Sequence, residues 1–238
     1  STMSLAGGFS GYLDLGEEPP REPEPEPRAP TPHVKPVFAM ETFYVSLKPE
    51  QRAVKAMAAA RDIVVLGLAN GEVMKLNIAE NEFEYVDVGG RRSDEIYKVF
   101  VDYTGQHILA SMMSGETFHI SKGPKKTKSD KRLLSKLKYG VVESVAWSRW
   151  EKEGALALLG TRQGVIAEVQ LEAGAPIKRT QRLFSFPSED DMQIQGLQVD
   201  RIVSAGGGDP ELLIMAASHN RLMTWRGGPR FPDVFDAF

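Results

Sequence analysis

The stretch that decides the fold runs from Ile63 to Leu76 and reads IVVLGLANGEVMKL. An apolar run leads into the dipeptide Asn70-Gly71, and apolar residues then alternate with polar ones. The run is typical of a strand buried on both faces, Asn-Gly of a tight hairpin turn, and the alternation of a second strand. The stretch therefore predicts a β-hairpin in which the first strand is fully buried.

The same pattern occurs three more times along the chain. The second turn residues of the four copies are 44, 49 and 56 residues apart: Gly71, Gly115, Gly164 and Asn220. A small residue stands four positions before each of them: Gly67, Ser111, Gly160 and Ala216. Candidate first strands precede the second and third copies (96–101 and 142–147), and candidate last strands follow the first and third (83–88 and 179–186).

Four strands in a unit of about 45 residues are the signature of a β-propeller blade. The Trp-Asp dipeptide of the best-known propeller repeat is missing, so the repeat is divergent. We predict an all-β fold, a β-propeller of four-stranded blades occupying residues 37–238, with blades near 48–88, 95–139, 141–186 and 193–238. Propellers have about four to eight blades, and these four fall within that range.

Residues 48–62, KPEQRAVKAMAAARD, conflict with the repeat. Their alanine content favours a helix, whereas their place in the pattern is that of the first strand of the first blade. Because tertiary context overrides intrinsic propensity, we predict a strand here.

Residues 1–36 differ in composition from the rest, because they hold eight of the fifteen prolines. The segment 17–28 reads EEPPREPEPEPR. Proline removes backbone donors and like charges oppose collapse, so we predict a disordered, solvated Pro/Glu-rich tail. The less favoured alternative is that it serves as a ligand for an aromatic-lined groove.

The composition excludes several classes of protein. The 238 residues include no cysteine, which excludes a disulfide scaffold, a thiolate metal site and a cysteine nucleophile. No run of eighteen apolar residues occurs, so no transmembrane helix is predicted. Residues 1–11 lack the pattern of a signal peptide, and an intracellular protein is the expectation.

No residue pattern points to catalysis, a metal or a cofactor. The four histidines lack the spacing of a zinc motif: His33, His107, His119 and His219. The run Gly206–Asp209 lacks the Lys-Ser/Thr and the helix of a phosphate loop and is interpreted as a hairpin loop. The acidic run Ser188–Asp191 is interpreted as a solvated turn rather than a cation site. A propeller hydrolase would need inward carboxylates, for which Glu143 is one scattered candidate. We predict neither an enzyme nor a small-molecule substrate.

The strongest charge feature is the basic segment, Lys122–Lys138, which reads KGPKKTKSDKRLLSKLK. Its eight Lys or Arg and one Asp give it a charge of +7, while the whole chain carries -3. It lies where the repeat places an exposed loop, so a solvated loop is the simpler interpretation. Among binding roles, an anionic membrane or an acidic protein is favoured over nucleic acid, because aromatic residues are missing from the run. The predicted contact residues are Lys125, Lys126, Lys128, Lys131 and Arg132.

Three stretches resemble the deep orange family of class C vacuolar protein sorting subunits: VFVDYTGQHILA (99–110), LKYGVVESVAW (137–147) and LGTRQGVIAEVQL (159–171). The strand-like VFAMETFYVSL (37–47) and NRLMTW (220–225) follow the order expected of that family, so the resemblance covers about residues 37–238.

The resemblance implies a core subunit of the endosomal and vacuolar tethering complexes HOPS and CORVET. It also implies a propeller of more than four blades, so we expect these four to be the N-terminal part of a larger propeller. It implies a non-catalytic scaffold that supports vesicle docking and fusion and protein transport to the vacuole or lysosome. Other tethering subunits would be its partners, at the cytoplasmic face of the late endosome and vacuole or lysosome. Such subunits continue into a helical solenoid and a RING domain; this chain has neither, so zinc binding and ubiquitin-related roles are not carried over. The alternative is a generic propeller adaptor outside membrane traffic.

Overall fold

The computed structural model describes residues 42, 47–48, 53–89, 94–123, 128–150, 155–187, 192–203 and 209–236. The chain divides into two units, residues 1–45 and 46–238, and every strand and helix of the described ranges belongs to the second unit. No helix within these ranges is long and apolar enough to cross a membrane.

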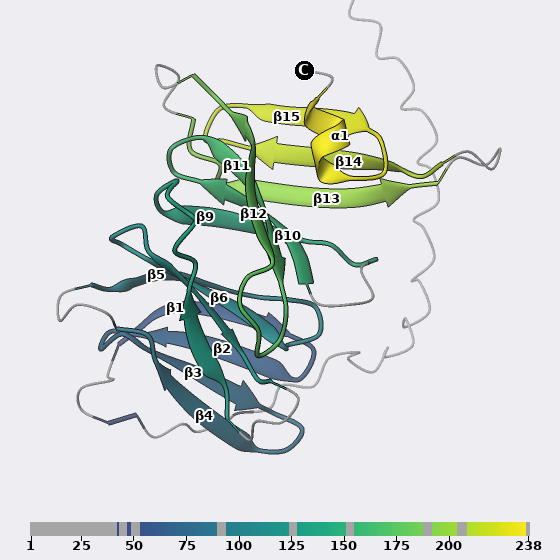
Figure 1. Cartoon of the computed structure of the whole chain (residues 1–238). Coiled ribbons are helices and arrows are strands. Elements are labelled where there is room, and N and C mark those ends of the chain that lie inside the picture. Colours follow the sequence, from purple (N-terminus) through teal and green to yellow (C-terminus); the bar gives the residue numbers. More distant parts are fainter. Residues whose placement is uncertain are drawn as a thin grey trace, which may run out of the picture. The chain divides into compact units, whose positions relative to one another are not determined.

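The described strands form four antiparallel sheets, and each sheet uses strands that follow one another in the sequence (Figure 1). The first sheet contains β1 (Val54–Ala60), β2 (Ile63–Leu68), β3 (Glu72–Asn77) and β4 (Glu82–Asp87). The second contains β5 (Ile96–Val101), β6 (His107–Met112), β7 (Thr117–Ser121) and β8 (Asp130–Leu133). The third contains β9 (Val142–Trp147), β10 (Ala155–Thr161), β11 (Val165–Leu171) and β12 (Arg179–Ser185). The fourth contains β13 (Gly196–Ile202), β14 (Glu211–Ala217) and β15 (Leu222–Gly227).

This arrangement confirms the predicted all-β architecture. The second and third strands of each sheet are the hairpin recognised in the sequence, and Gly71, Gly115 and Gly164 in three of its turns have φ of 82°, 91° and 74°. Only glycine adopts such values without steric cost, which explains the residue at that turn position.

Each pair of neighbouring sheets encloses its own hydrophobic core. One core lies between the first and second sheets and includes Val65 and Ile108. A second lies between the second and third sheets and includes Leu109 and Leu159. A third, between the third and fourth sheets, includes Ile166. The sheets are therefore held together face to face, as blades of a propeller are.

The small residue before each turn is explained by this packing. A Cβ on Gly67 would lie 2.7 Å from Cγ2 of Ile96, the first residue of the next sheet. At the equivalent position in the second sheet, Ser111 Oγ accepts a hydrogen bond of 3.0 Å from the backbone N–H of Val142, again the first residue of the next sheet. The position is small because the following blade begins against it.

Strand β1 agrees with the prediction from the sequence, and the fourth sheet differs from it. The alanine-rich segment forms β1 as predicted, and its six residue pairs with β2 outweigh its helix propensity. The fourth sheet, however, has three strands in the described ranges, where four were expected. The strand β15 ends at Gly227, Gly228 and Pro229 follow it, and the chain then forms the short helix α1 (Phe231–Phe235), whose buried Phe231 and Phe235 complete the third core.

Candidate functional site

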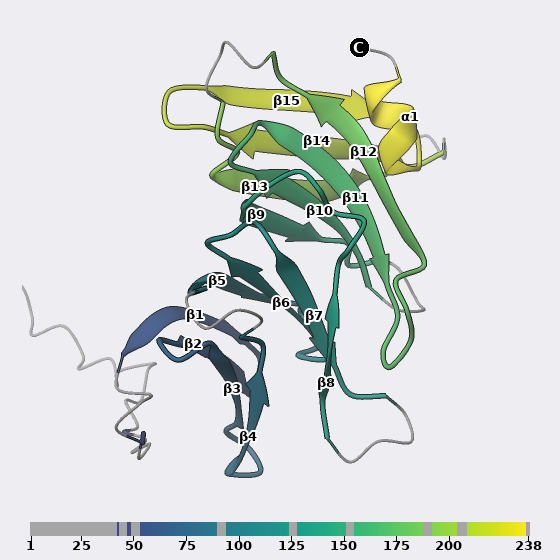
Figure 2. The same cartoon turned by 60° about the vertical axis from the view of Figure 1, so that its left-hand side comes forward.

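The basic segment contains β8, the outer strand of the second sheet (Figure 2). Lys125 and Lys126 lie outside the described residues. Lys128 and Lys131 are exposed, as predicted for contact residues. Arg132 is half-buried instead, and its Nη2 donates a hydrogen bond of 3.0 Å to the backbone carbonyl of Gly174. Within the described part of the predicted site, Lys128 and Lys131 face solvent, whereas Arg132 forms a hydrogen bond within the protein.

Strand β8 is fastened on both sides. The backbone N–H and the hydroxyl of Ser129 donate to the two carboxylate oxygens of Glu84 in β4. On the other side, the loop between β11 and β12 joins the second sheet: Gly174 N–H donates to Ser121 Oγ at 3.1 Å, beside the Arg132 contact. Lys131 is therefore presented from an anchored strand, and Lys128 lies two residues before that strand begins. The residues in these contacts are 42 to 53 positions apart in sequence, so the repeat pattern carried no signal for them.

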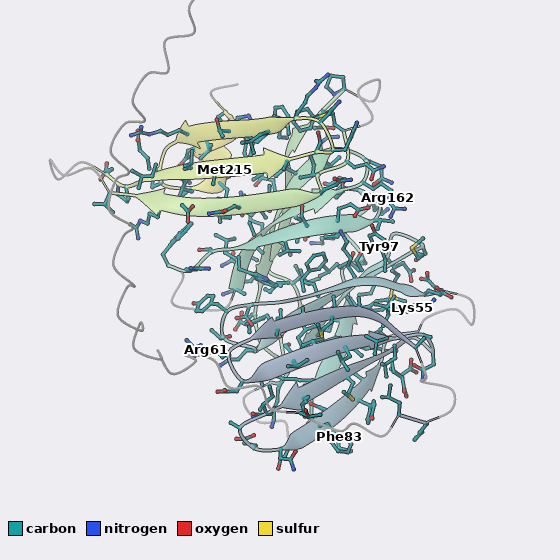
Figure 3. The ribbon with its side chains drawn as sticks, turned by 180° about the vertical axis from the view of Figure 1, so that it is seen from behind. Lys55, Arg61, Phe83, Tyr97, Arg162 and Met215 are labelled. Carbon is teal, nitrogen blue, oxygen red and sulfur yellow. The ribbon has the colours of Figure 1, made fainter. Side chains whose placement is uncertain are left out.

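A polar cluster joins the first strands of the second and third sheets. Glu143 in β9 is 3% exposed, and its Oε1 accepts a hydrogen bond of 2.8 Å from Arg162 Nε. Its Oε2 accepts from Tyr97 Oη at 2.8 Å and from Lys98 Nζ at 3.0 Å. The Arg162 guanidinium also lies over the Tyr97 ring, 4.7 Å from its centroid. Figure 3 shows Tyr97 and Arg162 side by side.

The electrostatics of this cluster keep the carboxylate charged. Burial alone would raise the pKa of Glu143, but the hydrogen bonds from Arg162, Tyr97 and Lys98 outweigh it and lower the pKa below its usual range. Both oxygens are occupied by donors, so Glu143 serves to join two blades. Glu143 was the candidate for an inward catalytic carboxylate, but in the structure its oxygens accept hydrogen bonds from the neighbouring blade and the turn after β10.

A second buried polar group contains two histidines that sequence spacing did not relate. His107 in β6 and His119 in β7 stack with ring centroids 5.2 Å apart, and His107 Nδ1 lies 3.0 Å from His119 Nε2. Asp102 Oδ1 accepts the His107 backbone N–H at 2.9 Å. Burial, and then the neighbouring His107, lower the pKa of His119 to about 3. Burial likewise lowers the pKa of His107. The pair is therefore neutral near pH 7, when one ring donates to the other.

Metal ligation was not predicted, and within the ranges that the structure describes no group of three or more His, Asp or Glu side chains is placed to hold a metal ion. The acidic run at 188–191, His33 and the glycines at 206–208 lie outside the described residues.

Comparison with known proteins extends the argument from fold to family. The Dos1 propeller superposes with a TM-score of 0.52 at 10% sequence identity, covering 76% of this chain and 48% of that one, which supports the fold alone. In sequence, the chain is similar to Vacuolar sorting protein 18 of Arabidopsis thaliana, 25% identical over 210 residues. It is also similar to the Vacuolar protein sorting-associated protein 18 homolog of Danio rerio, 20% identical over 143 residues.

These matches cover 85% and 58% of this chain. They span 21% and 14% of the two relatives, so the chain corresponds to about a fifth or less of their length. The model of the Pep3/Vps18/deep orange β-propeller domain matches residues 36–237, which include all four sheets and α1. The resemblance found in the sequence is thereby confirmed, and the chain belongs to the Pep3/Vps18/deep orange β-propeller family.

Proposed function

We propose that the chain is a non-catalytic interaction scaffold of an endosomal and vacuolar tethering complex of the HOPS and CORVET kind. It would support vesicle docking and fusion, and hence protein transport to the vacuole or lysosome, from the cytoplasmic face of the late endosome and vacuole or lysosome. The observation that carries the proposal is the family match over residues 36–237. The relatives' names place them in vacuolar protein sorting.

The physical character of the described residues supports a scaffold. The buried polar groups fasten one blade to the next: the Glu143 carboxylate bridges β5 and β9, and Ser144 Oγ donates to the Ile194 carbonyl, just before β13, at 2.6 Å. Rigid sheets that present loops are suited to holding several partners at fixed positions.

The test is a chimera. The part of the Arabidopsis protein that this chain matches would be replaced by the present sequence, in plant cells depleted of the native protein. We expect vacuole morphology to recover and the other tethering subunits to co-purify with the chimera. Recovery of unrelated propeller partners, without tethering subunits and without rescue, would favour the generic adaptor instead.

We further propose that the basic segment contacts the anionic membrane surface. Lys128 and Lys131 are exposed, beside and within the anchored strand β8, and Lys136 and Lys138 in the same segment are exposed as well. Each lysine near an anionic bilayer contributes about 1 kcal/mol, so a cluster of this size supports peripheral binding. An acidic protein is the competing partner.

Flotation with vesicles containing phosphatidylserine tests the contact. Charge reversal at the five predicted residues should abolish flotation. A sharper comparison sets K128E/K131E against R201E/R221E, because both pairs are exposed and both change the net charge by the same amount. Only the first pair should weaken binding. An equal loss of flotation in both double variants would mean that binding depends on overall charge. No loss of flotation in either would contradict the proposed membrane contact.

A further inference from the structure

A groove of about 680 Å³ runs along the first strands of the four sheets. Its lining comes from the ends of β1, β5 and β9 with the turns that follow them, and from β13. Figure 3 labels Arg61, which lines the groove, at the opposite side of the sheets from Tyr97 and Arg162. The groove is therefore separate from the Glu143 cluster. It lies along β5, at the opposite edge of the second sheet from β8 in the basic segment.

The groove combines an apolar floor with two aromatic side chains. Val145, Leu197 and Val199 contribute the apolar surface. Tyr103 and Trp147 also line it and are only half-buried, so both side chains can contact a ligand. Aromatic side chains that remain accessible beside apolar residues are typical of grooves that bind extended peptides.

Its charge is positive. Arg61 and Arg149 are exposed at the groove, and no carboxylate among the described residues forms an ion pair with either of them. Asp200 is the one acidic residue of the described lining, and its Oδ2 accepts a hydrogen bond of 2.7 Å from Gln198 Nε2. Within the described ranges neither guanidinium group has an ion-pair partner, and both are placed to bind carboxylates of a ligand.

The backbone at Arg61 gives a second reason to assign it a role. Arg61 occupies the β1–β2 hairpin turn with φ of 51°, in the left-handed region where glycine or asparagine is the usual choice. A long side chain here costs about 1–2 kcal/mol relative to ordinary backbone. Such strained positions cluster at functional sites, and the cost is accepted where the side chain is needed.

From this geometry we infer that the groove binds an extended, acidic, proline-containing segment of a partner protein. Glutamates of the segment pair with Arg61 and Arg149, and prolines pack on the Tyr103 and Trp147 rings. Proline preorganises the extended conformation, so less conformational entropy is lost on binding. The inference concerns a different surface from the membrane contact and does not depend on the tethering assignment.

The probe is a fluorescein-labelled twelve-residue peptide of alternating Glu and Pro, titrated into the full 238-residue chain by fluorescence anisotropy. Two matched peptides alternate Gln with Pro and Glu with Ala. We expect the Glu-Pro peptide to bind most tightly and both others to bind at least about tenfold more weakly, since each removes one of the two recognition elements. Binding should weaken as salt is added.

Variants locate the site. R61N removes the guanidinium but supplies a residue that tolerates positive φ, so it should fold at least as well as the parent while weakening the peptide by about tenfold. R149Q should do the same. R182Q, at an exposed arginine of β12, is the matched control and should leave the affinity unchanged.

Three results would overturn the proposal. They are no saturable binding of the Glu-Pro peptide, an affinity within twofold of the parent in both R61N and R149Q, and loss of binding in K128E/K131E with the groove variants unaffected. The last result would assign acidic ligands to the basic segment.

Discussion

At Glu143, a buried carboxylate holds two blades together through three donor side chains: Tyr97 and Lys98 from β5, and Arg162 from the turn after β10. E143Q keeps the shape of the side chain but removes its charge, leaving Lys98 and Arg162 without their anion. Because each of those cations is about a third exposed, water compensates in part, and we expect a loss of about 1–2 kcal/mol in the free energy of unfolding.

Urea denaturation measures the effect of E143Q. E95Q is the matched control, since Glu95 pairs with Lys55 at 3.2 Å on the surface, with both side chains substantially exposed. Such pairs contribute about 0–1 kcal/mol, so E95Q should leave the midpoint nearly unchanged. Equal effects of the two substitutions would show that the Glu143 cluster does not join the blades.

The buried histidine pair predicts how stability depends on pH. The pKa of His119 is about 3 in the folded protein, below the ordinary value of 6.5. Above pH 6.5 both folded and unfolded chains are neutral at this residue. As the pH falls below 6.5 the unfolded chain takes up a proton that the folded chain refuses, so stability decreases by up to about 1.4 kcal/mol per pH unit.

Thermal or urea unfolding between pH 6.5 and 5.5 tests this dependence, in a window that lies above the ordinary pKa of Glu. H119Q should reduce the slope, because glutamine does not titrate yet can still hydrogen-bond to His107. The lowered pKa of His107 should keep part of the dependence. H219Q alters an exposed turn histidine and should leave the slope as it is. A parent chain whose stability is constant over this window would contradict the assignment.

At the scale of elements, the small residue before each hairpin turn sets how closely two blades approach. A Cβ on Gly160 would lie 2.5 Å from Ser144 Oγ and would also overlap Ile194 Cγ2. G160A should therefore destabilise the protein by about 1–3 kcal/mol, the usual range for overpacking, as measured by urea denaturation. The double variant G160A/I194A should recover part of this loss by relieving the overlap.

Gly196 offers a matched control for Gly160. A Cβ there would meet the Ala217 Cβ at 3.4 Å, an ordinary contact, and the φ of Gly196 is not in the left-handed region. G196A should be neutral or slightly stabilising. If G160A were as stable as G196A, the close approach of the third and fourth blades at Gly160 would not be what requires a glycine there.

The individual strands show which parts of the fold could be predicted from the sequence. The hairpins were predictable because turn glycines and apolar alternation are local signals. Strand β1 was predictable only from its place in the repeat, since its alanines favour a helix. The three-stranded fourth sheet was not predicted, because residues 193–238 were assigned to a complete blade, whereas Gly228 and Pro229 end the sheet and lead to α1.

The candidate sites likewise include features that the sequence predicts and features that only the structure shows. A run of lysines is visible in any sequence, and Lys128 and Lys131 are exposed as expected. That Arg132 turns inward follows from the alternation of β8 only once the strand's position is known. The groove combines residues from four strands separated by some 40 residues each, and no local signal marks Arg61 or Arg149 as partners.

At the scale of the whole second unit, stability is shared between neighbours. Each described core joins two adjacent sheets, and none spans three. Molecules built this way lose structure locally before they unfold globally. Phe231, 1% exposed, belongs to the core between the third and fourth sheets, so F231A should cost about 3–5 kcal/mol there.

Hydrogen exchange measured by mass spectrometry locates the consequence of F231A. Amide protection should fall most in β13–β15 and α1, less in β9–β12, and least in β2 and β3, whose core contains no residue of the fourth sheet. F83A truncates a phenylalanine that is 64% exposed and should change protection little anywhere. If F231A lowered protection in β2 and β3 as much as in β14, the four sheets would unfold as one cooperative body, because coupling through shared cores alone would attenuate at each interface.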